Sequence, residues 1–198
     1  MPKRLFDTGV ATLALLLLWP LMLVIALIVK LDSPGPVFFR QQRVGRFGVP
    51  FRIHKFRTMV DGASQQGLQL TVGDDARITR SGRWLRRTRL DELPQLIDVL
   101  AGHMSMVGPR PEVPKYVAHY PPALRERVLA VRPGITDPAS LLYMDESERL
   151  ARADDPEREY VQMILPRKLQ CAADYAVRAT LLSDCGVLLR TLRRLVWR

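Results

Sequence analysis

Hydrophobic and polar positions divide the 198-residue chain into one long apolar run and a mixed remainder. Residues 8–29 carry no charged side chain, and most of them are leucine, valine, isoleucine or alanine. About 20 consecutive apolar residues suffice for a helix to cross the hydrocarbon core of a bilayer. The pattern therefore predicts a membrane helix within residues 1–32 and a separate domain over residues 33–198.

The route of this helix through the bilayer is left open by its residues. Pro20, near the middle, removes one helical hydrogen bond and favours a kink. Lys3 and Arg4 precede the apolar run and Lys30 follows it, so the cations that normally mark the cytoplasmic side favour neither orientation. A simple span is narrowly preferred over a helix that breaks at Pro20 and returns to the same face.

The beginning of the second domain has the period of β-structure. Residues 37–40 and 51–57 alternate between apolar and polar positions, and Gly45 and Gly48 between them predict the turn of a hairpin. Further along, residues 145–159 are acidic and polar, which predicts a solvated surface or loop.

The last segment has the period of a helix with two contrasting faces. Leu188, Leu192 and Leu195 share one face, whereas arginines line the other: Arg190, Arg193, Arg194 and Arg198. With Trp197 added, the profile is typical of a helix that lies in the membrane interface. A helix that covers the core of the domain is the alternative, and both can hold.

Two adjacent acids, Asp91 and Glu92, stand between a run of arginines and an apolar helical segment. The run contains Arg77, Arg80, Arg83, Arg86, Arg87 and Arg89. With Thr88 or Asp91 as the cap, Asp91 would lie at a helix start, where the helix dipole favours an ionised carboxylate. Successive residues point about 100° apart around a helix, so one acid would attack or bind a metal and the other would flank it. An ordinary capping acid beside ion-paired arginines is the simpler alternative.

Arg110 is held stiffly, because Pro109 and Pro111 restrict the backbone around it. A rigid arginine can approach a phosphate closely and bind it through two N–H groups. Arg132 and Thr136 repeat the combination of a cation, a rigid turn and a hydroxyl. An ordinary proline turn with an exposed arginine is the competing interpretation.

The overall charge limits the kind of partner. The formal net charge is +10 and the sequence pI is about 10.3. Nucleic acid, an acidic membrane surface and a phosphorylated small substrate would all suit such a chain. Cys171 and Cys185 match no metal-ligand spacing and the three histidines are scattered, so these residues predict no metal cluster.

A series of short motifs, in a fixed order along nearly the whole chain, resembles the small monotopic phosphoglycosyl transferases, a family of bacterial sugar transferases. The motifs are Lys3-Arg4 with Asp7, the apolar segment interrupted at Pro20, Arg43-x-Gly45, Lys55-Phe56-Arg57-Thr58-Met59, Leu90-Asp91-Glu92-Leu93-Pro94-Gln95-Leu96, Val107-Gly108-Pro109-Arg110-Pro111, Arg132-Pro133-Gly134-Ile135-Thr136 and the Tyr175…Asp184 tail.

The resemblance implies an α+β fold that is mostly helical. Its N-terminal helix would be re-entrant, broken at Pro20, with both ends on the cytoplasmic face of the bacterial inner membrane. A small β-hairpin and amphipathic interfacial helices would surround an active site at that membrane face. Lys3, Arg4 and Asp7 would position the chain against the membrane phospholipid.

The resemblance also implies the reaction. A sugar 1-phosphate would pass from a nucleoside diphosphate sugar, with UDP the expected nucleotide, to polyprenyl phosphate, and so initiate membrane glycan assembly. Asp91 would be a nucleophile that forms a covalent phosphosugar intermediate, Glu92 its partner, and Mg²⁺ would bind at Asp91. The expected substrate-binding residues are Lys55, Arg57, Arg83, Arg110, Pro111, Arg132 and Thr136.

The chain departs from the family pattern at Trp19, at Asp137-Pro138-Ala139-Ser140 and at Ala172. Because of the difference at Asp137-Pro138-Ala139-Ser140, sugar choice cannot be carried over. A membrane-anchored basic protein that binds nucleic acid or anionic lipid without catalysis is the alternative function. It would explain the charge and the anchor, but not the acidic pair or the stiff Arg110 turn. We therefore expect an enzyme without a nucleic-acid partner, and a homodimer is possible.

Overall fold

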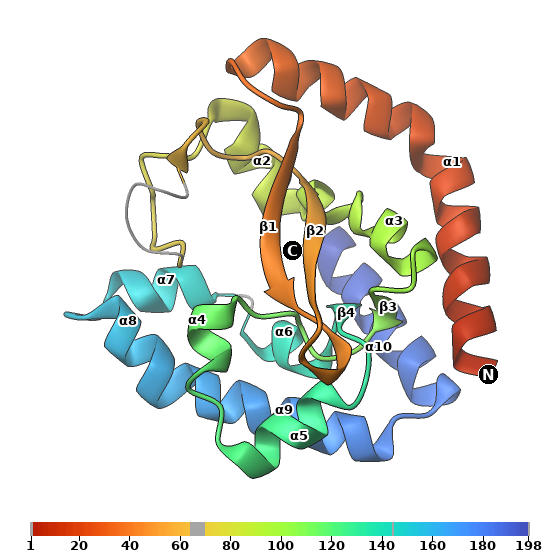
Figure 1. The fold of residues 1–198 in the computed structure, drawn as a ribbon. Helices are drawn as coiled ribbons and strands as arrows, with labels where there is room; N and C mark the ends of the chain where they lie inside the picture. Colours follow the sequence, from red (N-terminus) through yellow and green to blue (C-terminus); the bar gives the residue numbers. More distant parts are fainter. Residues whose placement is uncertain (1, 64–69, 144, 198) are drawn as a thin grey trace.

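A computed structural model describes residues 2–63, 70–143 and 145–197, which form a mostly helical fold with two small sheets (Figure 1). The helices are α1 (Pro2–Asp32), α2 (Arg80–Thr88), α3 (Gln95–Leu100), α4 (Pro114–Val117), α5 (Pro122–Leu129), α6 (Pro138–Leu142), α7 (Glu146–Ala151), α8 (Pro156–Glu159), α9 (Leu165–Arg178) and α10 (Leu181–Val196). Short 3-10 turns are η1 (Arg46–Gly48) and η3 (Leu90–Glu92), and η4 (Tyr160–Ile164) is a π-helix. The strands are β1 (Phe38–Val44), β2 (Pro50–Phe56), β3 (Ser105–Val107) and β4 (Gly134–Thr136).

The apolar run forms α1, which is long and apolar enough to cross a membrane by length and composition. The helix continues through Pro20 without interruption, so the sequence-based expectation of a break is met only by a change of direction part-way along α1 (Figure 1). A proline inside a helix removes a backbone hydrogen bond and displaces the preceding turn, which bends the helix.

The N-terminal end of α1 is fastened to the rest of the chain. Asp7, which is 2% exposed, accepts hydrogen bonds from Ser105 Oγ at 2.8 Å and from the Met106 backbone at 3.1 Å. Lys3 donates to the Val107 carbonyl at 3.1 Å, and Arg4 donates to the α3 backbone. The residues expected to position the chain thus tie α1 to β3 and α3.

The C-terminal end of α1 is fastened to the same domain by other contacts. Arg57 donates to the carbonyl oxygen of Ser33 at 2.7 Å, and Ser81 donates to Asp32. Ile25 and Val29 are each 1% exposed and pack in a cluster with side chains of β2 and α2. Both ends of α1 are therefore bound to the same domain.

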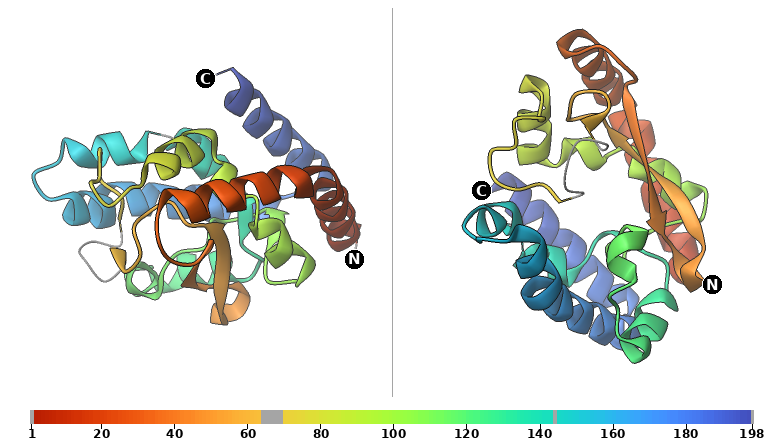
Figure 2. Two further views of the ribbon diagram at one scale, coloured as in Figure 1. Left: turned by 90° about the horizontal axis from the view of Figure 1, so that it is seen from above. Right: turned by 60° about the vertical axis from the view of Figure 1, so that its left-hand side comes forward.

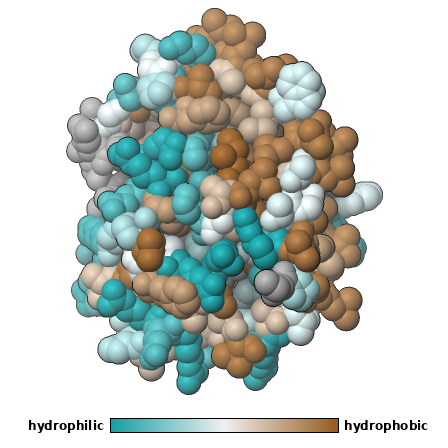
Figure 3. Space-filling model, turned by 45° about the vertical axis from the view of Figure 1, so that its right-hand side comes forward, coloured by the Kyte–Doolittle hydropathy of each residue, from teal (hydrophilic) through white to brown (hydrophobic). Residues whose placement is uncertain are grey.

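The outward side of α1 between these anchors is apolar and exposed. Its exposed large side chains include Leu13, Leu16, Leu17, Trp19, Leu23, Val24, Leu27 and Leu31. Figure 3, turned toward the α1 side, shows hydrophobic side chains gathered there. Such a surface is that of a membrane-associated helix.

The predicted hairpin is confirmed. β1 pairs antiparallel with β2, and the register sets Phe39 opposite Lys55 and Arg43 opposite Phe51. Because alternate side chains share a face, Phe39, Arg43 and Lys55 lie on the same side of the hairpin. Figure 2 shows this hairpin and the helices α9 and α10 on opposite sides of the domain.

The second sheet was not predicted from the sequence. β3 pairs parallel with β4, with Val107 opposite Thr136. Just after β3 the chain comes very close to the start of β4, since a Cβ atom on Gly134 would lie 2.1 Å from the Gly108 nitrogen. This approach sets the Arg110 turn against β4.

Helix α10 has one of the two roles that its sequence left open. Val187 is 2% exposed in a core cluster that also includes α1 and α3 residues, so one face covers the core. Leu182 and Leu189 on α10 and Trp197 just after it are exposed, and their location in a membrane interface stays a prediction. Two departures from the family pattern lie in helices. Ala172, on α9, is buried in the hydrophobic core. Trp19, on α1, is 56% exposed, so core packing does not explain the tryptophan there.

Candidate active site

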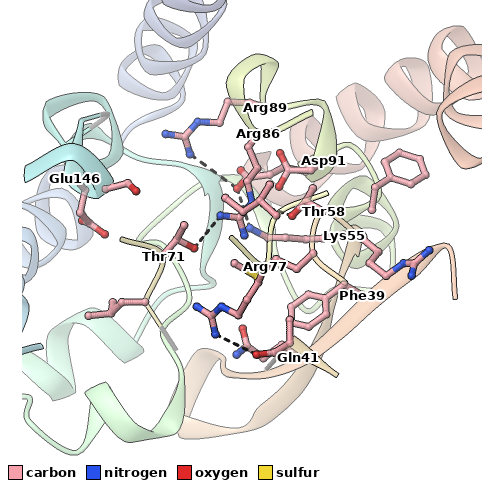
Figure 4. A pocket seen from close by; sticks show the side chains of 18 of the residues that line it. Phe39, Gln41, Lys55, Thr58, Thr71, Arg77, Arg86, Arg89, Asp91 and Glu146 are labelled. Atoms are coloured by element: carbon pink, nitrogen blue, oxygen red, sulfur yellow. Dashed lines mark hydrogen bonds and ion pairs between the residues drawn. The ribbon is translucent and has the colours of Figure 1, made fainter. Parts of the chain in front are cut away.

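A cavity of about 1480 Å³ lies between the hairpin, α2 and η3 on one side and α7, η4 and α9 on the other. Figure 4 shows Lys55, Arg86, Arg89 and Asp91 gathered on one wall of this pocket and Glu146 on the opposite wall. The acidic pair, Lys55, Arg83 and Arg110 all line it, so the structure brings together the central residues expected from the sequence.

Asp91 lies in the turn η3, not at a helix cap. Arg89, with φ 59°, ends α2 in the left-handed region, and the chain then turns into η3. Neither η3 nor α3 is capped by a side chain, and Thr88 donates back to the Trp84 carbonyl at 3.0 Å. The expectation that Thr88 or Asp91 caps a helix is therefore wrong, because the left-handed Arg89 separates α2 from the turn that carries the acids.

The carboxylate of Asp91 is buried but unpartnered. Asp91 is 7% exposed, and no described group makes a hydrogen bond to its Oδ1. Burial and the neighbouring Glu92 raise the pKa of Asp91, while Lys55, Arg86 and Arg89 oppose this rise. Asp91 thus places at the cavity wall a carboxylate whose Oδ1 is enclosed by the protein and accepts no hydrogen bond from a described group.

Glu92 is buried to the same degree and fully engaged. Lys55 Nζ donates to its Oε1 at 2.9 Å, and both terminal nitrogens of Arg110 bind its carboxylate. Burial alone would raise the pKa of Glu92, but Arg110 and Lys55 outweigh it and hold that pKa well below its usual range. Glu92 thus remains ionised and fixes the two cations in place.

Arg110 is oriented from several directions. Its guanidinium also donates to the Ile135 carbonyl at 3.1 Å, and its backbone N–H donates to Asp137 at 3.3 Å. Burial lowers the pKa of Arg110, but Glu92 more than reverses this and raises it. Asp137, one of the departures from the family pattern, is itself 2% exposed and caps α6 through Ser140.

Three other expected binding residues lie outside this cavity. Arg132 donates to the Gly102 carbonyl at 2.8 Å, and Thr136 shares a hydrogen bond with Thr191 at 2.9 Å. Pro111 adjoins a separate small hollow behind the Arg110 turn. The structure places these side chains in supporting positions around β3 and β4, and their expected contact with substrate stays a prediction.

Arg57 borders the cavity, but its guanidinium is directed elsewhere. It donates to the carbonyl oxygens of Val29, Ser33 and Pro34. These bonds hold the end of α1 and the start of the hairpin. The placement favours a role in anchoring the membrane helix over direct substrate contact.

Two partly buried cavity arginines were not singled out as site residues. Arg86 donates to Thr58 and Thr71, each at 2.8 Å, and burial lowers its pKa. Within a run of six arginines nothing distinguished it. Arg43 donates to the Pro111 carbonyl at 3.0 Å, and the hairpin register, which sets it on the face of Lys55, could have found it.

The family model described as bacterial sugar transferase matches residues 1–198. The chain belongs to this family. A UDP-glucose:undecaprenyl-phosphate glucose-1-phosphate transferase of Xanthomonas campestris pv. campestris is 40% identical over 98% of this chain and 38% of its own length. Proteins of the same name from Escherichia coli and Caulobacter vibrioides are 42% and 39% identical over 81% and 98% of this chain.

The chain spans different shares of these sugar transferases. It covers 38% of the Xanthomonas protein and 36% of the Escherichia protein, but 69% of the Caulobacter protein. The match places residues 1–198 in the family. It does not by itself assign to this chain the activity of its longer relatives.

The site offers a magnesium ion one unpaired carboxylate rather than a cluster of ligands. Within the described ranges no group of three or more histidine, cysteine, aspartate or glutamate side chains could hold a metal. Glu92 is bound by Lys55 and Arg110, which leaves Asp91 as the carboxylate of the pair whose Oδ1 has no described hydrogen-bond partner. Mg²⁺ in enzymes is commonly held by one or two carboxylates together with substrate phosphates and water, so a single unpaired aspartate suits it.

Proposed function

We propose that this chain transfers a sugar 1-phosphate from a UDP-sugar to a polyprenyl phosphate at the cytoplasmic face of a bacterial inner membrane, and thereby initiates glycan assembly. The observation that carries the proposal is the buried carboxylate of Asp91, whose Oδ1 has no described hydrogen-bond partner, at the wall of a cavity lined with cations. The names of the Xanthomonas and Caulobacter relatives, which are sugar-1-phosphate transferases, support the substrate class. They favour transfer over binding without catalysis.

In the first step an Asp91 oxygen attacks the phosphorus that bears the sugar. The new aspartyl O–P bond forms as the bond from that phosphorus to the bridging oxygen breaks, and UMP departs with the electron pair. A carboxylate can act as a covalent nucleophile and divide one difficult displacement into two easier ones. Because Glu92 is bound by Arg110 and Lys55, Asp91 is the acid of the pair that is free to attack.

In the second step a terminal oxygen of polyprenyl phosphate attacks the same phosphorus. The aspartyl O–P bond breaks, Asp91 regains its carboxylate, and polyprenyl diphosphate sugar is released. Both steps bring one anion against another, so the cations of the wall must offset the repulsion. Lys55, Arg86, Arg89 and Arg110 are the candidates, since each lines the cavity. Mg²⁺, if held by the Asp91 carboxylate, would add charge neutralisation on the phosphates.

The fold holds two of these cations, Arg110 and Arg86, in fixed positions. Arg110 is fixed by Glu92 and by the Ile135 carbonyl, and Arg86 by two threonine hydroxyls. Preorganised donors stabilise developing charge without having to reorient during the reaction. The site therefore needs only small adjustments when the diphosphate enters.

We further propose that α1 is re-entrant. Thirty-one helical residues extend roughly 46 Å, so a straight helix across the roughly 30 Å hydrocarbon core would place its ends on opposite sides. Here Asp7 near one end and Asp32 at the other both bond to the same domain. This supports a helix that dips into one leaflet, with Leu16, Leu17 and Leu23 toward the lipid.

The proposed reaction is tested with a UDP-sugar labelled in the sugar and its phosphate. Without acceptor, the wild-type chain in detergent should retain label covalently and release an equal amount of UMP. Addition of polyprenyl phosphate should move the label from protein to lipid. Asp91→Asn should neither retain label nor turn over, and sustained turnover by this variant would refute the covalent mechanism.

A further inference from the structure

The wall of the cavity opposite Asp91 has no part in the chemistry described above. Figure 4 shows Glu146 on this wall, across the pocket from Asp91. Glu112, Tyr160 and Lys168 line the same cavity. They come from the segment after β3 and from η4 and α9, so several distant parts of the chain converge there.

These four residues form one connected network, which we call the far wall. Tyr160 donates its hydroxyl to Glu112 Oε1 at 2.6 Å, and Lys168 Nζ lies 5.3 Å from the centroid of the Tyr160 ring. Lys168 also donates to Glu146 Oε2 at 2.9 Å. Burial and Glu112 raise the pKa of Tyr160, so its hydroxyl keeps the proton that it donates.

The far wall differs in charge from the wall that carries Asp91. Near Asp91, four cations (Lys55, Arg86, Arg89 and Arg110) face two carboxylates, which suits a diphosphate. On the far wall, Glu146 is paired with Lys168, and Glu112 lies 4.0 Å from the guanidinium of Arg43 on the hairpin. A surface of paired charges with fixed donors and acceptors suits a neutral, hydroxyl-rich group.

The direction of displacement decides which part of the substrate reaches the far wall. The attacking and leaving oxygens lie roughly in line in phosphoryl transfer. If Asp91 attacks from its own wall, the departing nucleotide points away from that wall, toward Glu146. The proposal below therefore rests on the proposed function, because it uses Asp91 as the nucleophile.

Of the two far-wall carboxylates, Glu146 is the more open. Glu112 uses Oε1 for Tyr160, while its Oε2 accepts from the Val113 backbone at 3.2 Å. Glu146 uses Oε2 for Lys168, and within the described chain no hydrogen bond reaches its Oε1. Its side chain is 25% exposed, so a ligand in the cavity can reach it.

We propose that Glu146, positioned by Lys168, accepts hydrogen bonds from the ribose hydroxyls of the uridine nucleotide. Carboxylates recognise vicinal ribose hydroxyls in other nucleotide sites for the same reason, namely that both hydroxyls can donate to one anionic group. Lys168 holds the carboxylate in place and compensates part of its charge near the phosphates.

Calorimetric binding of UMP and of 2′-deoxy-UMP to the full chain in detergent tests this assignment without requiring turnover. Glu146→Gln should weaken UMP binding by roughly tenfold or more and 2′-deoxy-UMP binding by clearly less, because the deoxynucleotide has only its 3′-hydroxyl to donate to the charged acceptor that is lost. Glu146→Asp keeps the charge for Lys168 but shortens the reach, and should give an intermediate ratio. Glu126→Gln removes the same charge from an exposed position on α5 outside the cavity and should leave both affinities unchanged.

The ratio of the two affinities separates the outcomes. An unchanged ratio in Glu146→Gln would overturn the ribose assignment, even if that variant were somewhat less stable, since lost folding lowers both affinities alike. A changed preference between UDP-glucose and UDP-galactose with an unchanged ratio would place Glu146 at the hexose instead and would also overturn it. The covalent-labelling experiment on Asp91 remains independent, so either proposal can fail alone.

Discussion

The surroundings of Asp91 and of Glu92 offer the most instructive comparison in this molecule. The two acids are successive in the chain and almost equally buried, at 7% and 8% exposure. Glu92 is bound by Lys55 and Arg110, whereas Asp91 Oδ1 has no described partner. Their pKa values accordingly move in opposite directions.

The difference shows that burial alone does not decide what a carboxylate can do. A buried acid that is fully paired is held ionised and becomes part of the scaffold. A buried acid without a partner keeps its lone pairs for a substrate, at a cost to the folded state. Successive side chains of the turn η3 point in different directions, which places the two acids in different surroundings.

The largest effect is expected for Asp91→Asn. Turnover should fall at least about a thousandfold, because the amide cannot replace the carboxylate as nucleophile. The thermal unfolding midpoint should stay the same or rise, because an unpaired buried charge is removed. Release of UMP and the unfolding midpoint, measured on one preparation in detergent, check the two halves together.

This variant would contradict the comparison if it unfolded at a much lower temperature than the wild type. Such a result would mean that Asp91 is paired in solution as Glu92 is. Asp98→Asn is the matched control, because Asp98 is 1% exposed but bound to the His54 side chain and backbone. It should lower the midpoint.

Glu92→Gln is expected to show the reverse pattern, with stability as the main loss. Lys55 and Arg110 would share no anion, and removing one partner of a buried ion pair costs about 3–5 kcal/mol. Denaturant unfolding in detergent measures this loss of unfolding free energy, with the exposed Glu126→Gln as control, expected within about 0.5 kcal/mol of wild type.

The pH dependence of stability gives a second check on Glu92. Because its pKa is depressed in the folded protein, its contribution is complete above the ordinary pKa of a glutamate and is lost as the pH falls toward the folded value. Wild type should therefore lose stability over that acidic range more steeply than Glu92→Gln. Parallel pH curves for the two proteins would show that Lys55 and Arg110 do not lower the pKa of Glu92.

The local parts of this arrangement could be predicted from the sequence. The hairpin follows from alternation and two glycines, and Arg110 draws attention because prolines flank it. The acidic pair stands out against its run of arginines. Each of these signals lies within a few residues of the feature that it predicts.

The remaining parts depend on contacts between distant segments. The β3–β4 pairing requires the close approach of Gly108 and Gly134, which no periodicity reports. Arg57 binds backbone carbonyls more than twenty residues away, so its sequence neighbours gave no hint of that role. Glu146 lies in the acidic stretch 145–159, whose sequence predicts a solvated surface or loop, yet the fold brings it to the cavity wall.

The smallest expected effect concerns the ionisation of Asp91. Its pKa is raised by burial and by Glu92 and lowered by the cations around it, Lys55, Arg86 and Arg89. Because the nucleophile must be ionised, kcat/KM for the UDP-sugar should fall as the pH drops through this raised pKa, while the lysine and arginines stay protonated. Arg86→Gln removes one opposing cation and should move the acid limb to higher pH. Arg80→Gln, an exposed arginine outside the cavity, should leave the limb in place. An acid limb that stays put or moves to lower pH in Arg86→Gln would assign the titration to a group other than Asp91, and with it the attacking oxygen.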